Sequence, residues 1–482
     1  MTILITIAIY FGILLLISNL TGKSGNDAFF RGNRQSPWQL VAFGMIGASL
    51  SGVTFISVPG MVNAIDMTYM QMCMGFFFGY IAVAFVLLPL YYKHGLTSIY
   101  SYLDTRFGTE SRITGASFFI LSKLTGAAAR LYLVCLILQQ FVFDTLGIPY
   151  FATVIATLLL IWLYTRRSGI RTLVWTDSLQ TFCLILALIL ILYKTISMLG
   201  MNVGDTFSAI WHDSHSRIFE FSDWSSKQHF VKQFFSGIFI VIVMTGLDQD
   251  MMQKNLTCKN LRDAQKDMCS YGILFMPVNF LFLSLGILMT MLYAKTGTPL
   301  PASGDSLLPN FIVSGRMGQT VLVLFTIGII ASAFSSADSA MTALTTSFCI
   351  DILDVENKDK RFYLHRERIR KTVHICMMVI FVAFILAFKS IGSTSVIDAI
   401  YVIASYTYGP LLGLFAFGMT TRRLPRGRFV PLIAILSPIV CYAIDSFTLN
   451  ATGYKFGYEM LMFNGMLTYA GLWMVSKKRT LA

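Results

Sequence analysis

Apolar runs of about 20 residues recur from one end of this sequence to the other. As a helix rising about 1.5 Å per residue, such a run crosses the hydrocarbon core of a bilayer, which is about 30 Å thick. Hydrophobic residues make up 55% of the 482-residue chain and charged residues only 13%, about half the charged share of a soluble domain. We therefore predict an all-α polytopic membrane protein. Its spans are expected at residues 2–20, 37–64, 67–91, 112–140, 147–164, 172–198, 229–252, 268–294, 318–351, 372–389, 394–419, 429–446 and 457–476.

The loops between these thirteen expected spans differ in charge. With the N-terminus outside the cell, most of the 37 Lys and Arg residues fall on one side of the membrane. Such an excess marks the cytoplasmic side, so we expect a cell-membrane protein whose C-terminus is cytoplasmic. The same alternation accounts for the net charge of +13, which therefore does not indicate a nucleic-acid partner. Because no basic residue precedes the first apolar run, we expect a retained helix there rather than a signal peptide.

The sequence contains no motif of a common enzyme or ATP-driven pump. We find no Gly-rich phosphate loop, no nucleophile elbow and no HExxH pair. The eight cysteines lie mostly inside the expected spans, at spacings unlike those of metal ligands. His212 and His215 flank Asp213 in the longest outer loop, either as a metal site or as part of a solvated loop. We therefore expect one transmembrane domain over 1–482, no enzymatic activity and no obligatory protein partner.

Two of the expected spans contain polar breaks at similar places. One break lies in "GMIGASLSGVTFISVPG", Gly44 to Gly60, and the other in "MTGLDQDMMQKN", Met244 to Asn255. Each opens a set of five spans, and an odd number of spans separates the two starts, so the sets must be inserted in opposite orientations. This is the pattern of an inverted repeat, in which discontinuous helices hold substrate and ion near the midplane. We expect repeats at about 37–198 and 229–419, although close helix contacts also explain the small residues.

A stripe of hydroxyl groups runs along the apolar span 318–351. Residues three and four apart share one face of a helix, and this spacing joins Ser332, Ser335, Ser336 and Ser339. Asp338 lies at the edge of the stripe, where an uncompensated carboxylate costs at least ~2.5 kcal/mol inside a bilayer. Hydroxyl and carboxylate oxygens suit a hard cation, so we expect a sodium site. The alternative is that the serines bond to carbonyls of their own helix.

A second acid, Asp177, lies a few residues inside the span 172–198. It either pairs at the membrane edge with Arg166, Arg167 or Arg171, or joins Asp338 from another helix.

Arg130 lies deep inside the span 112–140. An arginine within a membrane is a candidate functional residue by default, and its guanidinium group matches a carboxylate with two parallel hydrogen bonds. It therefore indicates an anionic substrate, or else a structural pair with an acid such as Asp248 or Asp338. Lys123, seven residues earlier, is expected to extend towards the cytoplasm.

The chain resembles the sodium/solute symporter family of sugar, proline, sialic acid, iodide and vitamin transporters. "GASLSGVTFISVPG" resembles the first core helix of that family, "WTDSLQ" the fifth, "GLDQDMMQKNLTCKNLRDAQK" the end of the sixth, and "ASAFSSADSAMTALTTSFCID" the eighth. The resemblance covers nearly the whole chain. It implies the LeuT-type fold, with two inverted five-helix repeats, one helix before them and two after.

The resemblance also implies where sodium binds. The principal site would use carbonyl oxygens of Gly47, Leu50 and Ser332 and the hydroxyls of Ser335 and Ser336, although the family usually has alanine at the positions of Gly47 and Ser332. A second site, present in some members, would use Asp177, Ser335, Asp338 and Ser339. Those members carry serine where this chain has Asp338. Two acids either strengthen a second sodium site or take up a proton, so one or two sodium ions are expected.

For the substrate, the resemblance implies six positions: Ser49, Ser51, Thr54, Cys73, Arg130 and Asp248. Cys73 stands where sugar and sialic acid transporters carry Gln or Glu, and Gln71 is close but on another face, a departure that weakens both assignments. Asp248 stands where sugar transporters have asparagine. Two further residues, Tyr406 and Tyr408, either close the outer side of the site or pack in the core.

Together these features predict a secondary active symporter. Sodium entry would drive the import of a small polar solute, with an anionic one such as sialic acid or another carboxylate favoured over a sugar or polyol. The alternative from another class is a membrane sensor or receptor that kept the fold without transport. No signalling domain follows Ser476, which disfavours it.

Overall fold

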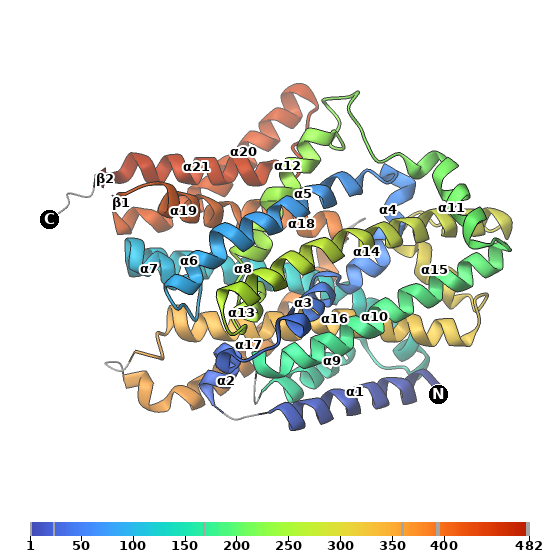
Figure 1. The fold of residues 1–482 in the computed structure, drawn as a ribbon, viewed down its shortest axis with the longest axis horizontal. Coiled ribbons are helices and arrows are strands. Elements are labelled where there is room, and N and C mark those ends of the chain that lie inside the picture. Colours follow the sequence, from blue (N-terminus) through green and yellow to red (C-terminus); the bar gives the residue numbers. More distant parts are fainter. Residues whose placement is uncertain (1, 23–24, 167–168, 358–360, 392–395, 479–482) are drawn as a thin grey trace.

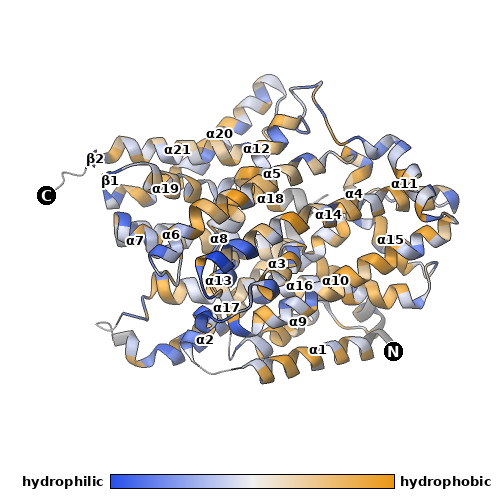
Figure 2. Ribbon diagram, viewed as in Figure 1, coloured by the Kyte–Doolittle hydropathy of each residue, from blue (hydrophilic) through white to orange (hydrophobic). Residues whose placement is uncertain are grey.

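The computed structural model describes residues 2–22, 25–166, 169–357, 361–391 and 396–478. Long helices lie side by side and account for nearly all of this part of the chain (Figure 1). Their surfaces are predominantly apolar, and polar residues concentrate near helix ends and on α13 (Figure 2). The expectation of an all-α architecture is confirmed. The longest helices are α8 (Thr109–Leu138), α10 (Ile170–Leu199), α14 (Leu261–Lys295), α16 (Gln319–Ser347), α17 (Arg366–Ile391) and α20 (Val430–Thr452).

Every expected span coincides with a long helix, a bent pair of helices or a short apolar helix. Within the described residues, seven helices are long and apolar enough to cross a membrane, and four bent pairs meet the same test when each is taken as one span. The number thirteen stays a prediction. The remaining elements of the expected spans are α1 (Thr2–Thr21), α5 (Tyr69–Ala82) with α6 (Leu88–Lys93), α9 (Tyr150–Thr165) and α21 (Met460–Val475).

Four pairs of helices are bent, and two of them are the breaks that the sequence indicated. The chain bends by 58° between α3 (Trp38–Ser49) and α4 (Gly52–Ile65), and by 68° between the π-helical end of α12 and α13 (Gln249–Asn255). Leu50 leaves the helical region with φ −77° and ψ 70°, so carbonyl groups near it lose their helical partners. The other elements of these pairs are α2 (Asn26–Arg31), α12 (Phe230–Val241), α18 (Val396–Thr407) and α19 (Gly409–Thr420).

The loops also contain secondary structure that the apolar pattern did not predict. The strands β1 (Arg423–Pro425) and β2 (Ser476–Lys478) pair antiparallel and join the end of α21 to the loop after α19. His215 bonds to Asp213 in its own loop through Nδ1 at 3.0 Å. Among the described residues, no three His, Cys, Asp or Glu side chains form a cluster that could hold a metal ion. Three short helices complete the fold: α7 (Ser101–Phe107), α11 (Val203–His212) and α15 (Leu307–Val313).

Helix α10 packs against both α3 and α16 and so places the ion-site candidates together. The contact with α3 depends on Gly47, because a Cβ atom added there would lie 2.0 Å from Oγ1 of Thr181 on α10. A glycine without a side chain lets two helices approach closely inside a membrane protein. The fold therefore holds the break after α3 against the middle of α10.

Candidate functional site

Two hydroxyls of the serine stripe on α16 reach across to the break between α3 and α4. Ser336 donates to the carbonyl oxygen of Ala48 at 3.1 Å, and Ser332 donates to that of Leu50 at 2.6 Å. Both serines are buried. Carbonyl and hydroxyl oxygens of this kind are the ligands that hard cations prefer. The break and α16 therefore supply four oxygen atoms close together inside the protein, which fits a bound alkali cation.

The other two serines of the stripe face α10 instead. Ser335 donates to Oδ1 of Asp177 at 2.8 Å, and Ser339 lies 3.5 Å from Oδ2. Ser335, expected in the principal site, is thus hydrogen-bonded on the Asp177 side. The hydroxyl of Thr181 bonds to the carbonyl oxygen of Asp177 at 2.7 Å and lies against Gly47. Sequence reasoning missed Thr181, although it follows Asp177 by four residues on the same face of the helix.

The partner of Asp177 is a buried lysine that the sequence did not indicate. Nζ of Lys254, on α13, lies 2.8 Å from Oδ2 of Asp177, and the two side chains are 2% and 0% exposed. The expected span 229–252 ends before Lys254, so the sequence predicts this lysine in a basic loop with Lys259 and Arg262. The structure corrects this assignment, since all of α13 is buried.

Asp338 completes this polar cluster beside Asp177. The hydroxyl of Tyr164, on α9, donates to its Oδ2 at 2.6 Å, and Ser339 donates to its Oδ1 at 3.2 Å. Ser339 therefore lies between the two carboxylates. All four candidates for the second sodium site, Asp177, Ser335, Asp338 and Ser339, are brought together by α10 and α16, with Lys254 among them.

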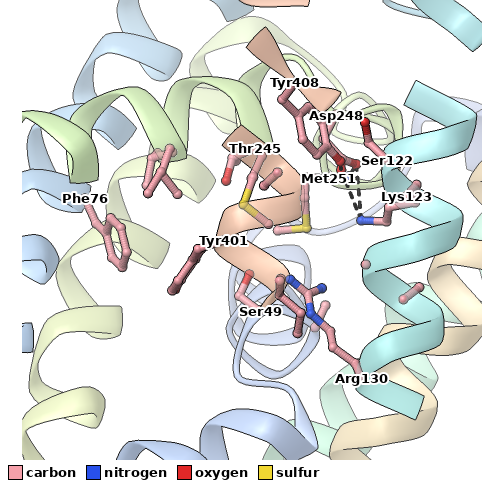
Figure 3. Close-up of a pocket in the computed structure, with 18 of the residues that line it drawn as sticks. Ser49, Phe76, Ser122, Lys123, Arg130, Thr245, Asp248, Met251, Tyr401 and Tyr408 are labelled. Carbon is pink, nitrogen blue, oxygen red and sulfur yellow. Dashed lines mark hydrogen bonds and ion pairs between the residues drawn. The ribbon is translucent and has the colours of Figure 1, made fainter. Parts of the chain in front are cut away.

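A cavity lies at the C-terminal end of α3, between α5, α8, α12, α14 and α18 (Figure 3). Its lining residues leave about 770 Å³ free of protein atoms, a figure that includes space open to solvent. Of the six predicted substrate residues, Ser49, Arg130 and Asp248 line it. Ser51, Thr54 and Cys73 are buried outside its lining. Gln71 donates to the carbonyl oxygen of Gln228 in the loop before α12.

The charge of Asp248 is already matched within the protein. Nζ of Lys123 lies 3.2 Å from Asp248 and 2.7 Å from Asp250, and the hydroxyl of Tyr408 donates to Asp248 at 2.6 Å. The side chain of Lys123 is only 9% exposed, so the expectation that it extends to the cytoplasm is wrong. Tyr408 binds Asp248 at the cavity, whereas Tyr406 bonds to Asp445 elsewhere.

Arg130 presents a guanidinium group to the cavity, and no acidic side chain in the described part of the chain pairs with it. Its side chain extends from α8 towards Ser49 and Tyr401 (Figure 3). Among the described residues, none forms a hydrogen bond or ion pair with it. The predicted alternatives, Asp248 and Asp338, are bound by Lys123 and Tyr164 instead. A guanidinium group at a cavity, with no acidic partner among the described side chains, favours an anionic ligand.

Tyrosines that the sequence did not single out form the opposite wall of the cavity. Tyr271, on α14, bonds to both Ser49 and Tyr80, the latter at 2.8 Å. Tyr401 bonds to Tyr69 at 3.0 Å. Phenol groups give a cavity both apolar area and hydrogen-bonding capacity. No spacing in the sequence marks them, because they come from three helices, α5, α14 and α18.

The profile of the Sodium:solute symporter family matches residues 29–433 of the chain. The chain belongs to this family. Among its relatives, the sodium/sialic acid symporter NanT of Aliivibrio fischeri is 25% identical over 92% of this chain and 88% of that protein. The sodium/sialic acid symporter SiaT of Proteus mirabilis is also 25% identical, over 85% and 84%.

A solved structure of a Na⁺-coupled sialic acid symporter, substrate-bound and outward-open, has the same fold. It superimposes with a TM-score of 0.84 at 21% identity and covers 99% of both chains. A nucleobase-cation symporter, Mhp1, gives a TM-score of 0.55 over 92% of this chain and 93% of that one. The expected family and the LeuT-type fold are therefore confirmed.

Membership in the family establishes the class of activity. The protein is a multi-pass membrane symporter that couples the movement of a small solute to sodium, and it is not an enzyme. Sodium is thus part of the cargo. The oxygen atoms between α16 and the break after α3 and the cavity lined by Arg130 are the candidate places for ion and solute.

Proposed function

We propose that this protein imports a small carboxylate, with sialic acid as the first candidate, together with sodium. One observation carries the proposal: Arg130 faces the cavity and pairs with none of the acidic side chains that the structure describes, while Lys123 and Tyr408 already bind Asp248. A carboxylate beside Arg130 would complete its charge and accept two hydrogen bonds. The printed names of the two sialic acid symporters among the relatives support this substrate class. A neutral sugar or polyol would leave the guanidinium unpaired.

We further propose that sodium binds between α16 and the break after α3. The resemblance implied the carbonyl oxygens of Gly47, Leu50 and Ser332. The hydrogen bonds favour a changed set, with the carbonyl oxygens of Ala48 and Leu50 and the hydroxyls of Ser332 and Ser336 as ligands. Each hydroxyl now donates to one of these carbonyls, and a cation between them would replace that hydrogen bond. Ser335 would approach the ion from its place beside Asp177. Because this site joins α3 to α16, bound sodium would order the end of α3, where Ser49 lines the cavity.

The arrangement of the chain in the membrane follows the same proposal. The breaks after α3 and before α13 would open two repeats of opposite orientation, at about 37–198 and 229–419. The N-terminus would lie outside and the C-terminus in the cytoplasm, in accord with the excess of basic residues in alternate loops. Cysteine accessibility at both ends of the chain in whole cells tests this orientation.

Uptake into proteoliposomes tests the function. We expect labelled sialic acid to accumulate in response to an inward sodium gradient and not a potassium gradient. Arg130→Ala should abolish this uptake, and Arg130→Lys should retain a part of it, because lysine keeps the charge without the bidentate geometry. Sodium-dependent uptake of a neutral sugar that is equal in the wild type and Arg130→Ala would refute the anion assignment and support the sugar alternative. A folded protein that binds solute but moves none would support a sensor.

A further inference from the structure

We propose that a pocket between the end of α9 and the beginning of α17 binds the phosphate of an anionic phospholipid headgroup. The pocket also reaches the end of α1, which runs along the edge of the molecule (Figure 1). Its lining residues leave about 1270 Å³ free of protein atoms, a figure that includes space open to solvent. The pocket shares none of its described lining residues with the solute cavity, so it is a separate site.

The guanidinium group of Arg370, on α17, lies at this pocket as a buried positive charge. Its side chain is only 2% exposed, and its Nε is buried without a hydrogen-bond partner among the described residues. Its Nη1 reaches only a backbone carbonyl, that of Arg166, at 3.5 Å, and its Cζ lies 4.3 Å from the ring centre of Phe29. A buried charge without a counter-ion is strongly unfavourable. Arg370 therefore points to an anionic ligand in the pocket.

A second unpartnered donor comes from α9. Nε1 of Trp162 is buried and has no acceptor within the described part of the chain, and Trp162 lines the same pocket. The N–H of a buried indole ordinarily has a partner. A phosphate group carries several acceptor oxygens and forms short, strong hydrogen bonds with guanidinium groups. One phosphate would therefore satisfy donors from both α9 and α17.

The side chains around these two donors give the pocket a positive charge. Arg166 and Lys371 are exposed at the pocket and Arg370 is buried there, whereas the one acidic residue among its described lining residues is Glu367, which is exposed. His374 also lines the pocket, but its ring nitrogens are already bonded to two threonines at 3.1 and 2.9 Å. The ligand is therefore recognised by two arginines, a lysine and an indole.

Apolar side chains beside the pocket favour a lipid over a free phosphate ion. Ile375 lines the pocket and is 42% exposed, and Val379, one turn further along α17, is 57% exposed. Residues four apart share one face of a helix, so this apolar surface leads away from the basic residues along α17, where an acyl chain would pack. In the orientation proposed above, this end of the helices faces the cytoplasm, where basic pockets between membrane helices bind anionic headgroups.

Thermal unfolding of the purified protein in detergent tests the proposal. Phosphatidylglycerol is added at increasing concentration, with phosphatidylcholine as the zwitterionic control and inorganic phosphate as the soluble one, because a ligand that binds the native state raises its stability. We expect phosphatidylglycerol to raise the unfolding temperature more than phosphatidylcholine does. Inorganic phosphate at the same concentration should leave it unchanged. Native mass spectrometry then measures how much phosphatidylglycerol stays bound to each variant.

Substitutions locate the effect in the pocket. Arg166→Gln and Lys371→Gln change exposed side chains, and each should raise the phosphatidylglycerol concentration for half-maximal stabilisation about fivefold. Arg368→Gln is the matched control, because it removes the same charge from an exposed position of α17 that does not line the pocket. Arg370→Gln should remove most of the lipid effect and leave the lipid-free protein at least as stable, because it removes a buried charge without a counter-ion.

Three results would overturn the proposal. Equal stabilisation by phosphatidylglycerol and phosphatidylcholine would exclude recognition of an anionic headgroup. An equal shift with inorganic phosphate would assign the pocket to a soluble anion. The same lipid response in the wild type, Arg166→Gln and Lys371→Gln, or an equal loss in Arg368→Gln, would place the lipid elsewhere. None of these measurements involves sodium or the solute, so a failure of sialic acid uptake would refute the proposed substrate alone.

Discussion

The hydroxyl of Tyr408 donates a 2.6 Å hydrogen bond to Oδ2 of Asp248 at the wall of the cavity. Hydrogen bonds to charged groups contribute roughly 1.5–3 kcal/mol to stability. Tyr408→Phe removes this hydrogen bond and should leave Oδ2 of Asp248 free to move. We expect the KM for solute to rise about tenfold or more, with the sodium dependence little changed. Tyr406→Phe is the matched control, because its hydroxyl bonds to Asp445 outside the cavity. Equal kinetics for the two variants would contradict a role of Tyr408 in the site.

The proposed principal sodium site predicts unequal effects for two hydroxyls of the same helix. Ser336 reaches the carbonyl oxygen of Ala48 on another helix, whereas Thr326 bonds at 2.8 Å to Leu322 in its own helix. Ser336→Ala should raise the sodium concentration for half-maximal uptake about tenfold, and Thr326→Ala should leave it unchanged. Sodium titrations of uptake measure both. An unchanged sodium dependence in Ser336→Ala and Ser332→Ala would exclude this site.

Gly47 predicts a steric effect that a second substitution relieves. In Gly47→Ala, the new methyl group would lie 2.0 Å from Oγ1 of Thr181, and overpacking of this kind costs about 1–3 kcal/mol or more. We expect a lower unfolding temperature and a partial recovery in the double variant Gly47→Ala/Thr181→Ala. Gly12→Ala is the control, because its Cβ would meet no atom within 4 Å. Additive losses of stability in the double variant would show that the contact does not limit packing.

The contacts of Glu220 in the loop before α12 predict a dependence of stability on pH. The hydroxyl and backbone N–H of Ser222 donate to Glu220 and hold the pKa of its carboxyl below the usual range, with Arg217 as an ion-pair partner. Because the folded pKa is lowered, this contribution is present above the unfolded pKa of about 4.3 and is lost as pH falls through the folded value.

Amide hydrogen exchange of residues 213–229 between pH 7 and pH 4 measures this loss. The loop should open more readily towards the acidic end in the wild type, and Glu220→Gln should exchange faster at pH 7 with a weaker dependence on pH. The same pH dependence in Glu220→Gln and the wild type would assign the effect to other groups.

Much of the fold and half of the site could be predicted from the sequence, because both depend on local patterns. Runs of apolar residues predict helices, and glycine and serine predicted where α3 ends. The i, i+3, i+4, i+7 spacing placed all four serines on α16, yet it did not predict that Ser332 and Ser336 face α3 while Ser335 faces α10. Which serine faces which helix depends on how α3, α10 and α16 pack together, and the spacing within α16 alone does not determine it.

Other positions depend on the breaks in the helices. The family resemblance implied Ser51 and Thr54 as substrate residues, and both follow the break at Leu50, where the change of dihedral angles resets the helical phase; the structure has them buried outside the lining of the cavity. Lys254 follows a second break and precedes a basic loop, so the composition of this segment predicted a solvent-exposed side chain. Only the burial of α13 among other helices brings it to Asp177.

Helix α13 is short, and its two ends lie at different sites in the protein: the solute cavity and the carboxylate of Asp177. Asp248 caps its first turn at the solute cavity, and Lys254 lies six residues on, about 9 Å along the axis. A helix of this length moves as a rigid body, so a displacement of one end also displaces the other end. If a solute in the cavity displaces Asp248, we expect the contact between Lys254 and Asp177 to change as well, and a coupling of this kind would be reciprocal. The seven residues of α13 therefore connect the solute cavity to the carboxylate of Asp177.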